Sequence, residues 1–407
     1  MVTALPSAPN ASDATGGFAV GPTAVRKALL ATGVVVLIGG CDLGSPPVLH
    51  PSPSRLVDVA DVNGDGALDV VGVGRGAYQV LVNDGGGGLT GDPVVLDGDV
   101  VAFDLGDVDG DGVVDRVDVN RGVSGPETVM LSIGDGLGGF GVPQLVATAI
   151  NAGHANDVAL GDVEGDGDAD LIVTRWSGVQ IYSNDGTGTF TDRGGEVFPC
   201  IDHAYLLTIT DVAFVDLDRD GDGDVVMTGW CEDKAENPGS ELRVEYNRGD
   251  GVFTHASGSS TGIQGPLAGL SIADVDEDGR DDVVVAAPQI SSVLVYRHGA
   301  NGPFSYERRL TIPTAAGDVE VDDIDSDGDL DLVVTAPGTG SGRVLYGDGL
   351  GQFPESHVVA TGGDLVGPVA VGSFDDDGSP DLVFGNDADS VDSSVTVLFN
   401  TRDGRQH

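Results

Sequence analysis

The sequence predicts an all-β fold, a seven-bladed β-propeller of four-stranded antiparallel blades, on three observations. First, a nine-residue acidic pattern recurs seven times, with acids or Asn at most of its first, third, fifth and ninth positions and Gly at the sixth. Second, successive copies start between 46 and 58 residues apart. Third, every copy lies among four short strand-like runs, and four such strands in about 50 residues are typical of a propeller blade. The copies begin at Asp61, Asp107, Asp162, Asp216, Asp274, Asp323 and Ser373.

The runs around each copy predict the four strands of a blade, one after another along the chain. An alternating apolar run such as 56–60 precedes the acidic copy, a β-branched run such as 171–174 follows it, and a glycine-rich turn such as 184–190 comes before the fourth run. The 3.6-residue periodicity of helical solenoids is absent, and a closed ring leaves no strand edge to aggregate. The seventh repeat ends at about residue 400 without a fourth strand. We therefore expect Val48, Leu49 and His50 to supply that strand and close the ring.

The composition limits the possible partners. The 407 residues include 66 acidic and 19 basic ones, for a net charge of −47. Nothing in such a chain could neutralise a run of phosphates, which excludes nucleic-acid binding. The acidity has two interpretations, a solvated surface as in proteins adapted to high salt, or clustered oxygen ligands for hard cations. Hydrophobic residues at 40% of the chain are sufficient for a substantial core.

The N-terminus predicts export. Arg26 and Lys27 precede an apolar run over 28–38, and Gly39, Gly40 and Cys41 follow, which resembles a prokaryotic lipobox. Residues 1–41 are thus interpreted as a signal region cleaved before Cys41, whose lipid would hold the chain at the cell envelope or cell surface and be its only membrane contact. The alternative is a plain secretory signal with Cys41 an ordinary thiol. Residues 42–55 would form a tether with the closing strand, and residues 48–404 the propeller.

Two cysteines remain after Cys41. An oxidising compartment would favour a disulfide between Cys200 and Cys231. The alternative is two separate buried thiols.

The spacing of the acids indicates metal binding. Side chains at alternate positions of a tight loop converge on one point, and the glycine permits the sharp turn. Several carboxylates with a backbone carbonyl and a water suit calcium better than magnesium. An EF-hand would need Glu at its twelfth position, and none of the seven copies has it. The loops are not interpreted as simple turns, because ordinary turns do not need four acids.

Seven such loops with trailing Asn-Asp-Gly-x-Gly-x-Phe turns resemble the FG-GAP/VCBS repeats of integrin α-chain N-terminal propellers and their bacterial relatives, over residues 48–404. The resemblance implies up to seven calcium ions, each bound between the first and second strands of a blade. We expect Ser373 to make the seventh site the weakest, and the longer Glu164 to distort the third. Carried over by position, the ligands are Asp61, Asn63, Asp65 and Asp69; Asp107, Asp109, Asp111 and Asp115; Asp162, Glu164, Asp166 and Asp170; Asp216, Asp218, Asp220 and Asp224; Asp274, Asp276, Asp278 and Asp282; Asp323, Asp325, Asp327 and Asp331; and Ser373, Asp375, Asp377 and Asp381.

No catalytic motif is recognisable. The seven histidines are scattered, and neither a Gly-x-Ser-x-Gly elbow nor a phosphate-binding loop occurs. The sequence therefore favours a monomeric, non-enzymatic module that binds a protein or carbohydrate and acts in adhesion or scaffolding. The alternatives are a polysaccharide lyase or hydrolase, which some relatives of this family are, and a non-catalytic subunit of an envelope complex.

A partner could dock on the face opposite the acidic loops. Aromatic and arginine residues, the types that anchor partners, cluster there in the sequence pattern. The alternative is that these side chains pack under longer loops. The expected surface residues are Arg75, Tyr78, Arg121, Arg175, Trp176, His203 and Trp230.

Overall fold

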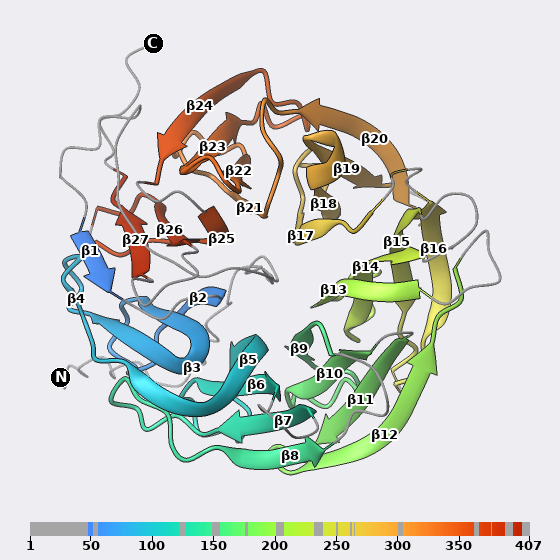
Figure 1. Cartoon of the computed structure of the whole chain (residues 1–407). Coiled ribbons are helices and arrows are strands. Elements are labelled where there is room, and N and C mark those ends of the chain that lie inside the picture. Colours follow the sequence, from blue (N-terminus) through green and yellow to red (C-terminus); the bar gives the residue numbers. More distant parts are fainter. Residues whose placement is uncertain are drawn as a thin grey trace, which may run out of the picture.

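The computed structural model describes residues 48–51, 56–121, 127–148, 155–175, 178–200, 207–231, 239–249, 251–260, 263, 265–299, 304–361, 366–375, 377–386 and 394–400. These residues form a ring of antiparallel blades around a central axis (Figure 1). The first strand of each blade lies nearest the centre, and the fourth lies at the circumference. The seven-bladed propeller expected from the repeats is confirmed.

Four consecutive blades are regular four-stranded sheets in which each strand pairs with the next one along the chain. Blade 3 comprises β9 (Val158–Gly161), β10 (Asp170–Arg175), β11 (Gly178–Asn184) and β12 (Phe190–Val197); blade 4 comprises β13 (Leu207–Val215), β14 (Asp224–Cys231), β15 (Ser240–Tyr246) and β16 (Thr254–Ser260). Blade 5 comprises β17 (Ala268–Ala273), β18 (Asp282–Ala287), β19 (Ser292–His298) and β20 (Phe304–Thr311), with the short 3-10 helix η1 (Pro288–Ile290) before β19; blade 6 comprises β21 (Val319–Asp322), β22 (Asp331–Ala336), β23 (Ser341–Tyr346) and β24 (Glu355–Ala360).

Blades 1 and 2 are joined into one continuous sheet. In blade 1, β3 (Asp69–Asn83) provides both the second and the third strand: its first part pairs with β2 (Leu56–Ala60), and its last part pairs with β4 (Leu89–Thr90). The strand β5 (Val94–Gly106) begins as the outer strand of blade 1 and ends as the inner strand of blade 2. Blade 2 is completed by β6 (Asp115–Arg121), β7 (Glu127–Ser132) and β8 (Gln144–Thr148).

Blade 7 closes the ring with strands from both ends of the described chain. It consists of β25 (Val366–Gly372), β26 (Asp381–Asn386), β27 (Ser394–Leu398) and β1 (Val48–Pro51), in that order. The segment expected to supply the missing strand is β1, and Val48 pairs with Val397 in antiparallel register. The backbone hydrogen bonds between β1 and β27 thus connect the start of the propeller to its end.

The core consists of seven apolar layers, and each layer lies between two neighbouring blades. Both faces of an inner sheet are therefore buried, which explains why runs such as β18 are apolar at every position after the first rather than alternating. Among the described residues, no helix is long and apolar enough to cross a membrane. The predicted signal and lipobox, including Cys41, lie outside the described residues.

Candidate metal sites

Each acidic loop connects the first strand of its blade to the second, as expected. The loops are numbered 1 to 7 here, after their blades. In loop 4, for example, residues 216–224 run from the end of β13 to the start of β14. The loop joins two paired strands directly, so the strand pairing on either side holds its side chains close together.

The first-position carboxylate organises the loop in six of the seven blades. In loop 4, Asp216 accepts the backbone N–H of Asp220 on Oδ1 at 3.1 Å and that of Gly221 on Oδ2 at 3.1 Å. The same two contacts recur in loops 1, 2, 3, 5 and 6. In loop 7 the Ser373 hydroxyl instead donates to the carbonyl of Asp375 at 3.0 Å.

Two further backbone features are shared by the loops. The fifth-position carboxylate accepts the N–H of the seventh residue in all seven loops, for example Ala67 N to Asp65 Oδ1 at 2.9 Å. The sixth-position glycine has a positive φ in every loop, from 78° at Gly378 to 102° at Gly328. A side chain other than glycine would be strained there, which gives the expected role of this glycine a physical basis.

The ninth-position aspartate is buried in all seven loops and ties three chain segments together. In loop 4, Asp224 accepts the N–H of Leu217 on Oδ2 at 2.8 Å and the N–H of Asn247, at the end of the third strand, on Oδ1 at 2.9 Å. The contact to the end of the third strand recurs in every blade. The ninth position is therefore a structural residue as well as a candidate ligand.

Burial makes the ionised form of these aspartates costly. Desolvation raises the pKa of Asp170 and of Asp224 to about 6, and that of Asp282, Asp331 and Asp381 to about 7. Backbone N–H donors lower these pKa values, and neighbouring loop carboxylates raise them further. A divalent cation among the carboxylates would remove most of that cost.

Four loops bring three carboxylates within reach of one cation. One oxygen from each of the first, third and ninth positions lies within 4.8 Å of the others in loops 2, 4, 5 and 6. Loop 1 has Asn63 at its third position, and the Asn63 side chain donates to Asp65 at 2.9 Å. The structure thus shows acidic clusters that could hold metal ions. These clusters are Asp107, Asp109 and Asp115; Asp216, Asp218 and Asp224; Asp274, Asp276 and Asp282; and Asp323, Asp325 and Asp331.

Loop 5 gives the strongest sign that a cation fits. The Asp282 side chain is 1% exposed, and its Oδ2 is buried without a hydrogen-bond donor, whereas the same oxygen in the other six loops accepts the N–H of the second residue. A buried carboxylate oxygen with no donor is expensive unless a cation completes its shell. The all-oxygen donor set suits a hard cation such as calcium.

Loop 3 differs from its neighbours. The Glu164 side chain forms an ion pair with Arg193 on β12. The Glu164 carboxylate is therefore neutralised by the Arg193 guanidinium. Arginines also approach loop 5, where Arg297 pairs with Asp276 and Arg280 pairs with Asp278.

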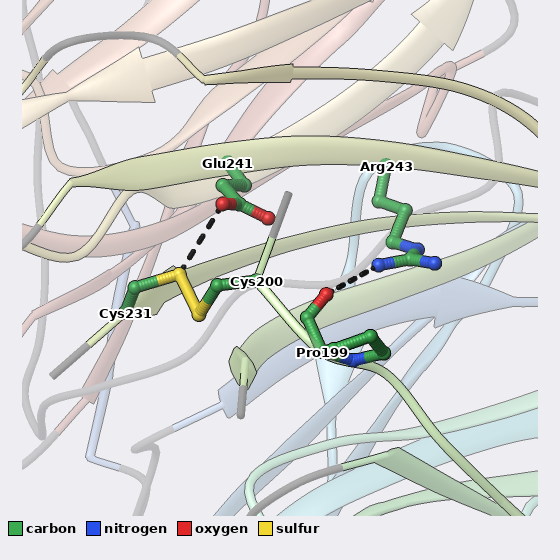
Figure 2. The surroundings of a disulfide bond; sticks show 5 residues. All are labelled: Pro199, Cys200, Cys231, Glu241 and Arg243. Atoms are coloured by element: carbon green, nitrogen blue, oxygen red, sulfur yellow. Dashed lines mark hydrogen bonds between the residues drawn. A yellow bond between two sulfur atoms is a disulfide. The ribbon is translucent and has the colours of Figure 1, made fainter. Parts of the chain in front are cut away.

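Cys200 and Cys231 form a disulfide, with their Cα atoms 6.1 Å apart, so they are not separate thiols (Figure 2). The bond links the connection after β12 to the end of β14, and it therefore joins blades 3 and 4. Glu241 Oε1 lies 3.3 Å from Cys231 Sγ, and Arg243 donates to the carbonyl of Pro199 at 2.8 Å. These contacts hold the start of the connection against β15.

One residue of the expected partner face is buried. Tyr78 was predicted to be exposed, and this is wrong: its ring is 6% exposed, with the Arg116 guanidinium 4.2 Å from its centroid and Phe140 against its edge. The third-strand part of β3 packs against blade 2, so the alternative of buried packing holds at this position. Trp230 is half-buried.

The remaining partner-face residues divide into two groups. Arg121 is 40% exposed and pairs with Glu127 at 2.7 Å, and Arg175 donates to the carbonyl of Val179 at 2.9 Å. Both arginines are thus engaged within their own blades. Trp176, His203 and the side chain of Arg75 lie outside the described residues.

One set of site residues was missed from the sequence: the asparagines that begin the glycine-rich turns. Their side chains reach the acidic loop of the preceding blade, as at Asn184, whose Nδ2 donates to the carbonyl of Val108 at 2.7 Å. The signal was present, because the turns at 83, 184, 247 and 400 all start with Asn.

Comparisons with known proteins agree with this architecture. Residues 162–227, 274–334 and 323–384 match the family model of the FG-GAP-like repeat. A lectin from Agrocybe aegerita that recognises non-reducing terminal N-acetylglucosamine is 22% identical, with 91% of this chain and 96% of that chain covered and a TM-score of 0.57. The periplasmic gluconolactonase PpgL of Pseudomonas aeruginosa is 15% identical, with 84% and 98% covered and a TM-score of 0.54.

A third similar structure is BBS1N in complex with ARL6DN, at 13% identity, 92% and 99% coverage and a TM-score of 0.55. No curated protein matches the chain. At these identities the solved structures establish the fold alone. The repeat matches and the ring of blades show that the chain is a β-propeller that contains FG-GAP-like repeats.

Proposed function

We propose that this chain is a calcium-stabilised propeller that serves as a non-enzymatic binding module. The observation that carries the proposal is the recurrence of one arrangement, three carboxylates of the first, third and ninth positions within 4.8 Å, in four different blades. Repulsion among these carboxylates destabilises the cation-free fold, so an ion bound to the folded state alone would stabilise it by mass action.

Calcium is the cation that these loops suit best. The donors that the structure brings together are carboxylate oxygens on a tight loop, and calcium accepts six to eight oxygens in flexible geometry. Magnesium would demand a stricter octahedron and retain waters. The role of the ion is structural, because each loop joins the inner two strands of a blade.

A thermal melt tests the calcium proposal. We expect excess EDTA to lower the melting temperature by many degrees, calcium to restore it, and elemental analysis of the dialysed chain to find several calcium ions. Asp218→Asn should reduce the calcium-dependent rise, whereas Asp135→Asn, an exposed acid in a turn of blade 2, should leave it unchanged. An identical melt with and without EDTA, together with no detectable metal, would refute the proposal.

The proposed partner is a protein or a carbohydrate, and the propeller acts as a monomer. The lectin likeness supports a binding role only by showing that this fold can display a sugar site. A pull-down with the calcium-loaded chain, compared with Trp176→Ala and Trp230→Ala together, checks whether the face opposite the loops takes part. Equal recovery of partners by both chains would exclude that face.

We also propose that the chain is exported and anchored through lipidated Cys41. The lipobox-like sequence supports this. Cys41→Ser should move the chain from the membrane fraction to the soluble exported fraction. An enzymatic role on polysaccharide is the alternative, and release of unsaturated or reducing products from acidic polysaccharides would establish it.

A further inference from the structure

The turn asparagines link neighbouring acidic loops directly. In blade 3 the Asn184 backbone N–H donates to Asp170 Oδ1 of its own loop at 2.7 Å. The Asn184 side chain donates to the carbonyl of Val108, the second residue of loop 2, at 2.7 Å. One residue is thus bonded to the acidic loops of two blades at once.

The same bridge occurs at three other blade boundaries. Asn247 connects Asp224 of loop 4 to the carbonyl of Val163 in loop 3, at 2.9 and 2.6 Å. Asn83 connects Asp69 of loop 1 to the carbonyl of Phe374 in loop 7, at 2.8 Å for both bonds. Asn400 connects Asp381 of loop 7 to the carbonyl of Ile324 in loop 6.

The bridged residue is itself fixed on both sides. Ile324 donates its N–H to Asp331 of its own loop at 3.0 Å, accepts Asn400 on its carbonyl, and is 3% exposed. The equivalent Val108, Val163 and Phe374 are each 1% exposed and make the same contact to their own ninth-position aspartate. A close-packed residue cannot absorb a shift of one partner without moving the other.

Three boundaries lack the bridge. Gly134 and Gly347 stand at the equivalent turn position of blades 2 and 6, and a Cβ atom at either would overlap a backbone carbonyl, of Val114 and of Leu330 respectively. An asparagine at either position would require the backbone to shift. In blade 5 the position is His298, whose Nε2 lies 3.4 Å from the Tyr246 hydroxyl of blade 4. The bridges therefore divide the loops into two triads, 2–3–4 and 6–7–1, with loop 5 separate.

We propose that Asn83, Asn184, Asn247 and Asn400 are positioning residues that make cation binding cooperative. Asn83 and Asn400 couple loops 6, 7 and 1, whereas Asn184 and Asn247 couple loops 2 and 4 through loop 3, and loop 5 binds independently. The inference rests on the proposed calcium function. A cation changes the charge around the ninth-position aspartate, and the hydrogen bonds pass the resulting shift to the next loop. Loop 7, which lacks a first-position carboxylate, depends most on its bridged neighbours.

A cycle of variants of the full chain tests the coupling. Ions bound per chain are counted by native mass spectrometry during a calcium titration. Asp325→Asn, which disables loop 6, should remove one ion and raise the calcium concentration needed for the last ion by about fivefold, at the low end of typical couplings. The last ion to bind is the one in loop 7, the weakest site. In the Asn400→Ala variant this ion should already need about five times more calcium than in the unchanged chain. Adding Asp325→Asn to that variant should cause no further shift.

Asn156→Ala is the matched control. The Asn156 side chain also donates to a carbonyl across a blade boundary, that of Ile209 at 2.7 Å, but within the part of the chain that the structure describes it has no hydrogen bond to an acidic loop. The Asp325→Asn shift should persist in that background. If Asn400→Ala fails to fold, the same cycle is repeated between loops 1 and 7 with Asn83→Gly and Asp65→Asn. Glycine is chosen because blades 2 and 6 already have glycine at the equivalent position.

Two results would overturn the inference. An equal shift from Asp325→Asn with and without Asn400→Ala would mean that the bridge transmits nothing, although calcium binding would stand. A chain that binds no calcium at any concentration would remove both the proposed function and the coupling.

Discussion

Loops 3 and 4 share their backbone hydrogen bonds and differ in the acid at the third position, Glu164 in loop 3 and Asp218 in loop 4. Both place a buried ninth-position aspartate against two backbone N–H groups, with equal pKa elevation to about 6. In loop 4, Asp218 stays with Asp216 and Asp224 as a cation-sized cluster. In loop 3, Glu164 pairs with Arg193. The repeat pattern determines the loop's shape, and the side chain at the third position determines whether three carboxylates lie within reach of one cation.

The largest effect should come from the feature that the two loops share. Asp224→Ala and Asp170→Ala each remove two charge-assisted hydrogen bonds from buried N–H groups, so each should lower the free energy of unfolding by roughly 3 to 5 kcal/mol. Denaturant titration in EDTA would measure this. A much smaller loss at either position would show that the N–H groups find other acceptors.

The third position should separate the loops. Asp218→Asn should remove one calcium ion and part of the calcium-induced rise in melting temperature, because loop 4 loses a ligand. Glu164→Gln should leave the number of calcium ions unchanged, since its partner is Arg193. Elemental analysis measures the calcium content of both variants. Equal calcium loss would show that loops 3 and 4 do not differ in calcium binding.

The raised pKa of the ninth-position aspartate predicts how calcium stabilisation depends on pH. The pKa of Asp224 is raised to about 6 in the folded chain, above an unfolded value of about 3.9. Its protonated form therefore stabilises the calcium-free fold below pH 4, and that contribution is lost as the pH rises to about 6. Calcium needs the ionised form, so the calcium-induced rise in melting temperature should grow between pH 5 and pH 8. A rise that shrinks with pH would contradict this account.

Replacing Arg193 should have the smallest effect. The Arg193 side chain is 48% exposed, so its ion pair contributes only about 0.2 to 1 kcal/mol. Arg193→Ala in EDTA should lower stability by that amount. In calcium the variant should bind one additional ion, because Glu164 is released. No additional ion would mean that the length of Glu164, not its pairing, excludes the cation.

The blades, the seven loops and the closing strand could be predicted from the sequence because each depends on local spacing. Glycine at the sixth position and acids at alternate positions determine a loop wherever they occur. The Asn184 bridge joins residues 76 positions apart, and the burial of Tyr78 depends on blade 2 packing over β3. Such contacts depend on how blades face each other, which the spacing within one repeat does not specify.

The most direct test of the central claim is an anomalous difference map from crystals grown in calcium, which locates each ion individually. The account predicts strong peaks in loops 2, 4, 5 and 6, and no peak in loop 3. Empty density at those four loops, or a peak in loop 3 as strong as that in loop 4, would contradict it.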